Sequence, residues 1–135
     1  MRRPTPAHPR ARRFAAALLG CIAAATPAAA QSAAPETRPY DDKLLRLSEI
    51  LGAVHYLREL CGANDGSHWR DRMNELMNTE GSSALRRAKL TRSFNNGYRS
   101  YSRTYGTCSS TAQTAVDRFL AEGADIADNL AKNAP

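Results

Sequence analysis

Apolar positions recur at three- and four-residue steps from about residue 40 onward, and this period predicts helices. Asp41 and Asp42 begin the first helical stretch, where the helix dipole favours acidic side chains. Gly62 suits the position just past a helix end, so we expect this helix to begin near Tyr40 and to end before Gly62. Its repeating positions are Leu44, Leu47, Leu51, Val54, Leu57 and Cys61.

Three more helical stretches follow, each preceded by a serine that suits a helix N-cap. The second covers residues 67–79, and the third starts after Ser82 or Ser83. The fourth starts near Ser109 or Ser110. No stretch alternates apolar and polar residues with the strand-forming types, so we expect an all-α fold, a small bundle of about four helices.

The third stretch contains the segment FNNGYRSYSRTYGTC, residues 94–108. Its Asn95-Asn96-Gly97 triplet favours a turn and could divide the helix in two. The phase of the aromatic residues on either side favours one continuous helix instead. The residues that keep this phase are Phe94, Tyr98, Tyr101 and Tyr105.

Two faces of this third helix differ in chemistry. On a wheel of about 100° per residue, the four aromatic residues share a sector of roughly 80° with Leu90 and Cys108. An aromatic stripe at helical spacing usually packs inside a small protein, so we expect this face to belong to the core. The opposite sector holds Lys89, Arg92, Arg99 and Arg103.

The first 30 residues have the layout of a secretory signal peptide. Five arginines precede an apolar run that starts at Phe14 and ends in three alanines. The run is short and alanine-rich for a membrane span, and a small polar segment with prolines follows it. We predict a signal peptide at 1–30, a flexible linker at 31–39 and a helical domain at 40–132.

The three cysteines fall into two groups. Cys21 lies in the apolar run after Leu-Leu-Gly, which is a lipoprotein-like motif, but the residues after it stay apolar. We expect membrane attachment only if Cys21 is lipidated. Cys61 and Cys108 form an even pair in an exported chain, and we predict a disulfide between the ends of the first and third helices.

Removal of residues 1–30 changes the charge balance. The full chain carries a net charge of +6, whereas residues 31–135 hold 14 basic and 13 acidic side chains. Six of those basic residues and no acid lie within 82–105. This basic segment is either paired with acids of neighbouring helices or open to an anionic partner. The acids that could pair with it are Glu75, Glu80, Glu122, Asp125 and Asp128.

Signals for catalysis or metal binding are weak. His55 and His68 lack a third ligand at helical spacing, and no phosphate-binding glycine loop or nucleophile motif occurs. A pair of carboxylates for glycan cleavage could come from Glu49, Glu59, Glu75 or Glu80, but their spacing alone does not place two in one cleft. We therefore predict no enzymatic activity, no catalytic residue, no metal site and no cofactor.

The segments LRELCG, HWRDRMNELM and FNNGYRSYSRTYGTC resemble a family of small exported alphaproteobacterial proteins with two well-separated cysteines and no assigned activity. The resemblance covers roughly residues 40–123. It implies a periplasmic, disulfide-bonded helical domain, and it supplies no catalytic residue. The matching positions are Cys61, Trp69, Arg70, Met73, the Phe94-Asn95-x-Gly97-Tyr98-Arg99 run and Cys108.

These observations predict a non-enzymatic binding module of the cell envelope, located in the periplasm. Its partner would be anionic, either peptidoglycan or an acidic envelope protein, because guanidinium groups bind carboxylates and phosphates. Export argues against nucleic acid as the partner. A structural or assembly subunit of an envelope complex is the alternative, and a small cell-wall hydrolase is a third possibility. The expected binding residues are Lys89, Arg92, Tyr98, Arg99 and Arg103.

Overall fold

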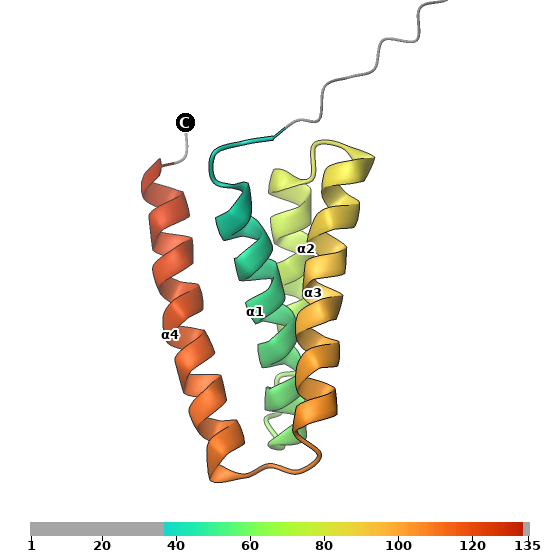
Figure 1. The fold of residues 1–135 in the computed structure, drawn as a ribbon, viewed down its shortest axis with the longest axis vertical. Coiled ribbons are helices and arrows are strands. Elements are labelled where there is room, and N and C mark those ends of the chain that lie inside the picture. Colours follow the sequence, from blue (N-terminus) through green and yellow to red (C-terminus); the bar gives the residue numbers. More distant parts are fainter. Residues whose placement is uncertain (1–36, 134–135) are drawn as a thin grey trace, which may run out of the picture. The chain divides into compact units, whose positions relative to one another are not determined.

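The computed structural model describes residues 37–133, and all of its regular structure there is helical (Figure 1). The predicted signal peptide and most of the predicted linker lie outside the described residues. The expected all-α class with four helices is confirmed, and the helix ends agree with the predicted ones within a few residues. The helices are α1 (Asp41–Leu60), α2 (His68–Glu80), α3 (Ala84–Thr104) and α4 (Ser110–Asn133).

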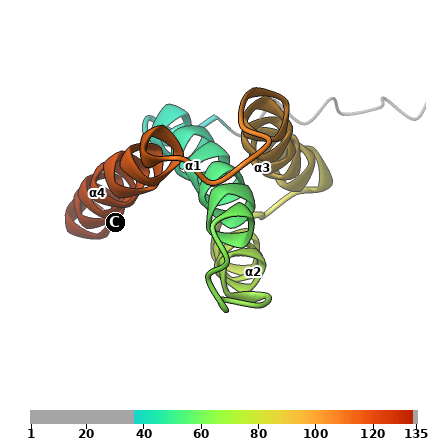
Figure 2. The same ribbon diagram turned by 90° about the horizontal axis from the view of Figure 1, so that it is seen from below.

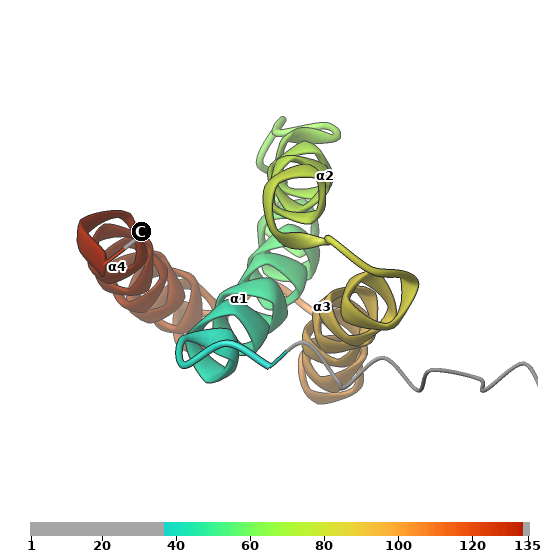
Figure 3. The same cartoon turned by 90° about the horizontal axis from the view of Figure 1, so that it is seen from above.

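Helix α1 is the centre of the helical unit and contacts the other three helices. Helix α3 packs most extensively on α1, and α2 packs on both α1 and α3. Helix α4 packs mainly on α1 and meets α3 through the rings of Phe119 and Tyr101, whose centroids lie 4.9 Å apart. The backbones of α2 and α4 lie on different sides of α1 (Figures 2 and 3). This arrangement leaves one side of α1 only partly covered.

Two of the helix ends have the caps that the sequence suggests, and one predicted cap residue bonds elsewhere. Gly62 adopts a φ of 73°, and the amides of Gly62 and Ala63 donate to carbonyls of the last turn of α1, as in a Schellman motif. Ser83 accepts a hydrogen bond from the amide of Arg86 and caps α3. Ser67 occupies the N-cap position of α2, but its hydroxyl donates to Asp71 rather than capping an amide.

The apolar core has two parts. Between α1 and α4, Leu57 and Phe119 are almost fully buried, and between α1, α2 and α3 so are Leu44, Met73 and Leu90. The aromatic face of α3 packs against both parts, as expected, although each of its rings remains half-buried. These rings are those of Phe94, Tyr98, Tyr101 and Tyr105.

Helix α3 runs without interruption through Asn95-Asn96-Gly97, and the reason is a close helix crossing. Gly97 is buried against α1, where a Cβ on its backbone would overlap the carbonyl oxygen of Glu49. Gly52 of α1 is placed in the same way against the carbonyl oxygen of Phe94. The two glycines therefore let the backbones of α1 and α3 approach more closely than side chains would allow.

Replacement of Gly97 with alanine is expected to destabilise the fold. Alanine normally stabilises a helix interior by about 1 kcal/mol over glycine, but here the added methyl group collides with backbone rather than with a movable side chain. We expect a loss of about 1–3 kcal/mol in the free energy of unfolding, measured by urea denaturation. The exposed neighbour Asn96 gives the control, because Asn96→Ala should be neutral or slightly stabilising. Equal effects of the two changes would contradict the close crossing.

The predicted disulfide is present between Cys61 and Cys108, 47 positions apart. Cys61 caps the end of α1, and Cys108 lies in the loop between α3 and α4. The expectation that Cys108 shares the buried aromatic face of α3 is wrong, because α3 ends at Thr104 and Cys108 is exposed. The bridge therefore holds the α3–α4 loop against the end of α1.

Candidate anion-binding face on helix α3

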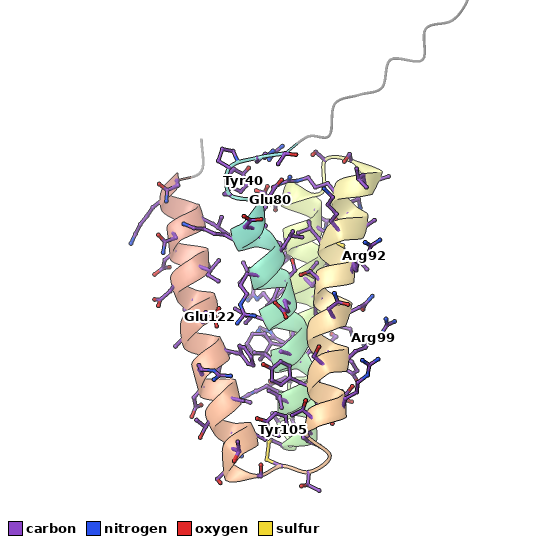
Figure 4. The ribbon with its side chains drawn as sticks, viewed as in Figure 1. Tyr40, Glu80, Arg92, Arg99, Tyr105 and Glu122 are labelled. Carbon is purple, nitrogen blue, oxygen red and sulfur yellow. A yellow bond between two sulfur atoms is a disulfide. The ribbon has the colours of Figure 1, made fainter. Side chains whose placement is uncertain are left out.

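The four predicted basic residues of α3 are all exposed, and we call them the basic face: Lys89, Arg92, Arg99 and Arg103. Their spacing of three, seven and four residues places them along one side of the helix. Figure 4 shows Arg92 and Arg99 extending away from α1 into the surroundings of the bundle. The helix thus separates an outward row of cations from its inward aromatic rings.

The acids that could have neutralised this face are engaged elsewhere or lie far from it. Glu75, Glu80 and Glu122 form ion pairs with arginines outside the basic face. Asp125 and Asp128 belong to α4, whose backbone stays away from α3 although the rings of Tyr101 and Phe119 touch. Within residues 37–133, no carboxylate forms an ion pair with a member of the basic face; the pairs that do form are Arg38–Glu80, Arg46–Glu49, Arg46–Glu122, Arg58–Asp65, Arg72–Glu75, Arg86–Asp41 and Arg86–Glu80.

A shallow depression adjoins the basic face between α2 and α3. One guanidinium at its edge is held in place, because Arg87 Nη1 donates to the carbonyl of Met77 at 2.9 Å. Two asparagine side chains add amide donors between the arginines, and carboxylates are absent from its lining. Sequence analysis did not single out Arg87, Asn95 or Asn96 for binding, although their three- to five-residue spacing from Arg92 or Arg99 could have placed them on the same side of a helix. The lining residues are Met77, Arg87, Ala88, Thr91, Arg92, Asn95, Asn96 and Arg99.

Tyr98 lies apart from the other predicted binding residues. Its ring is half-buried against α1, with ring centroids 5.3 Å from Tyr56 and 5.7 Å from His55. Burial lowers the pKa of His55, and this effect outweighs that of Glu59, which raises the pKa. The lowered pKa favours a neutral imidazole in this cluster. Tyr98 therefore does not stand beside the arginines, and we leave it out of the candidate site.

Arg86 belongs to the basic segment in sequence but not to its exposed face. Its side chain is only 6% exposed, and its Nη1 lies 2.5 Å from Asp41 Oδ1. Its Nε donates to the carbonyl of Glu80 at 2.6 Å, and its Nη2 lies 3.4 Å from the Glu80 carboxylate. Burial acts to raise the pKa of Asp41, but the Arg38 amide and the Arg86 guanidinium together lower it. This cluster joins the start of α1, the end of α2 and the start of α3.

The remaining titratable groups serve local structure. Asp65 accepts hydrogen bonds from Arg58 and from the Trp69 indole, which together hold its pKa below the ordinary value.

Of the four glutamates considered for glycan cleavage, three are ion-paired with arginine, and Glu59 is exposed on α1. In the described part of the chain, histidine, cysteine and acidic side chains nowhere gather into a group able to hold a metal ion. None of the described helices is long and apolar enough to cross a membrane.

Comparison with known protein families gives one match. The profile of DUF2385, described as a protein of unknown function, matches residues 39–133. The chain belongs to this family. The matched range spans all four helices, the disulfide and the basic face, so the predicted resemblance to a family without an assigned activity is confirmed at this level. No curated protein and no solved structure matches the chain significantly.

Proposed function

We propose that this DUF2385 member is a non-enzymatic binding module of the cell envelope that acts in the periplasm. Its basic face contacts an anionic partner, and peptidoglycan, with the carboxylates of its stem peptides, is the partner that we favour. The observation that carries the proposal is the row of exposed cations on α3 that forms no ion pair with any acid of residues 37–133.

Two features support a surface that binds anions rather than one that only keeps the protein in solution. The arginines have their forked donors available, since the acids of α1, α2 and α4 that form ion pairs do so with other arginines. The amides of Asn95 and Asn96 lie between Arg92 and Arg99, so a carboxylate there meets neutral and charged donors together. Export is supported by the signal-peptide pattern of residues 1–30.

Reversal of two charges on this face is expected to abolish wall binding. In a sedimentation assay with purified sacculi at low salt, the unaltered protein should appear in the pellet. The Arg92→Glu/Arg99→Glu variant should bind at least about tenfold more weakly, because charge-assisted hydrogen bonds are replaced by repulsion. Raised salt should also weaken the binding of the unaltered protein to sacculi, because salt screens the charges.

The matched control is Lys43→Glu/Arg118→Glu, which changes the net charge equally at exposed positions of α1 and α4. This control should sediment like the unaltered protein. If the unaltered protein stays in the supernatant at low salt, peptidoglycan is not the partner. If both double variants lose binding equally, net charge rather than the α3 face is responsible.

A further inference from the structure

A groove follows the line where α2 and α3 meet, next to the basic face. The depression that holds Arg92 and Arg99 continues into a second one of about 410 Å³, because Met77 and Thr91 line both. On α3 the groove extends from Arg87 to Arg99, a length of about 18 Å at the helical rise per residue. The residues that line only the second depression are Ser67, Arg70, Asp71, Met73, Asn74 and Phe94.

The floor of this α2–α3 groove is apolar. Met73 is buried, and Met77 and Phe94 are half-buried. The Thr91 hydroxyl donates to the Met77 sulfur at 3.2 Å, which ties the two helices together at the floor. Thioether side chains adapt to small apolar groups, so methyl-sized side chains fit here. None of the described residues that line the groove is a tyrosine or a tryptophan, so it offers no broad aromatic platform for a sugar ring.

The rims of the groove supply positive charge from both helices. Opposite the arginines of α3, helix α2 supplies Arg70, which is exposed and forms no ion pair within residues 37–133. Burial is the main cause of the lowered pKa of His55, and the charge of Arg70 adds to it, so Arg70 lies near α1 at this end of the groove. The one acid of the lining, Asp71, accepts a hydrogen bond from the Ser67 hydroxyl at 2.6 Å. This charge pattern suits a ligand that carries carboxylates.

The shape and chemistry of the groove fit a short extended peptide. An extended chain advances about 3.3 Å per residue, so a groove of about 18 Å holds roughly five residues. Carboxylates of such a peptide reach guanidinium groups on either rim, while its small apolar side chains lie on the floor. The stem peptides of peptidoglycan are short and combine alanine methyl groups with several carboxylates.

We propose that the α2–α3 groove binds the stem peptides of peptidoglycan and that the glycan strand stays outside it. This inference rests on the proposed function and extends its site from α3 onto α2. Arg70 binds a stem carboxylate from the α2 side, and Arg92 and Arg99 bind carboxylates from the α3 side. An alanine methyl group of the stem lies on Met77, beside the amide of Asn74.

Titration of the protein with a soluble stem peptide, followed by the NMR signals of its backbone amides, tests the groove. The probe is L-Ala–γ-D-Glu–meso-diaminopimelate–D-Ala, and the sugar control is chitotetraose. The peptide should bind in the millimolar range, because a single stem lacks the avidity of the polymer, and it should shift the signals of Asn74, Met77 and Asn95 but not those of α4. A peptide that shifts none of the groove signals, or chitotetraose that shifts the same ones, would overturn the proposal.

A pair of arginine variants on α2 tests the second rim. Arg70→Ala should weaken binding of the stem peptide at least about fivefold, because a charge-assisted hydrogen bond is lost. The matched control is Arg72→Ala, since Arg72 pairs with Glu75 at 2.8 Å and lines a different, apolar groove between α1, α2 and α4. This control should bind the peptide like the unaltered protein. Equal effects of the two variants would show that Arg70 has no specific role.

Sedimentation with sacculi separates failure of this inference from failure of the proposed function. If the protein pellets with sacculi but the stem peptide does not bind and Arg70→Ala pellets equally, the wall is bound without the groove and only this inference is wrong. If the unaltered protein does not pellet, the proposed function is wrong and the inference falls with it.

Discussion

Replacement of both bridge cysteines, Cys61→Ala and Cys108→Ala, is expected to lower the free energy of unfolding by about 4 kcal/mol. The bridge joins residues 47 positions apart, and the closure of a loop of that length removes about this much conformational entropy from the unfolded chain. A domain of this size is typically stable by only about 5–15 kcal/mol, so the loss is a large fraction of the total. Urea denaturation would measure this loss, provided that the free energy of unfolding depends on urea concentration with the same slope in both proteins.

Reduction of the native protein gives an independent check on this value. The reduced chain and the double alanine variant should unfold at similar urea concentrations, because both lack the same constraint. The helical circular-dichroism signal should remain before the transition, since Leu57 and Phe119 are buried in an apolar cluster formed by several residues of α1 and α4. A double variant as stable as the oxidised protein would show that the bridge adds no net stability.

The Arg86→Ala change is expected to destabilise the fold by about 3 kcal/mol. Arg86 is the buried cation between Asp41 and Glu80, whose side chains are only about one-fifth exposed. Its removal leaves two partly buried carboxylates facing each other without their shared partner, and such losses are typically larger than the net value of the ion pair itself. Thermal or urea denaturation would measure the change.

The neighbouring exposed residue provides the control for this cluster, since Arg87→Ala should alter stability by no more than about 0.5 kcal/mol.

The dependence of the unfolding free energy on acidic pH is a second readout. Although burial opposes the shift, the pKa of Asp41 is lowered in the fold, so its stabilising effect is present above the ordinary aspartate pKa and is lost as the pH falls through the lowered value. Arg86→Ala should reduce this part of the acid dependence, and an unchanged pH profile would contradict the role of Arg86.

Most of the helical architecture could be predicted from local patterns. The three-to-four-residue period along α1 and α4, the stop at Gly62 and the serine before α3 are signals contained within one turn or two of the chain. The phase of the aromatic residues favoured a continuous α3, but the Asn95-Asn96-Gly97 triplet left this open, and the structure shows that α3 is continuous where Gly97 packs against α1. The disulfide followed from the count of cysteines in a chain that we predict to be exported rather than from geometry.

The candidate site was predictable in outline because it lies on a single helix. The positions of Arg92, Arg99 and Arg103 on one side of α3 require only the helical period. Whether these cations are free or paired was not predictable, since that depends on which acids neighbouring helices bring near them. The structure placed Arg86 in the interior and Tyr98 against His55, and it added Asn95 and Asn96 to the site.

The sequence by itself determined the helices, their ends, the cysteine pair and the row of cations, because each of these depends on residues close together in the chain. Only the tertiary structure decided that Gly52 and Gly97 meet at a crossing, that Arg86 is buried, and that α2 and α4 leave an apolar groove between them. These features depend on the distances between helices, which follow from the packing of side chains far apart in sequence rather than from any local period.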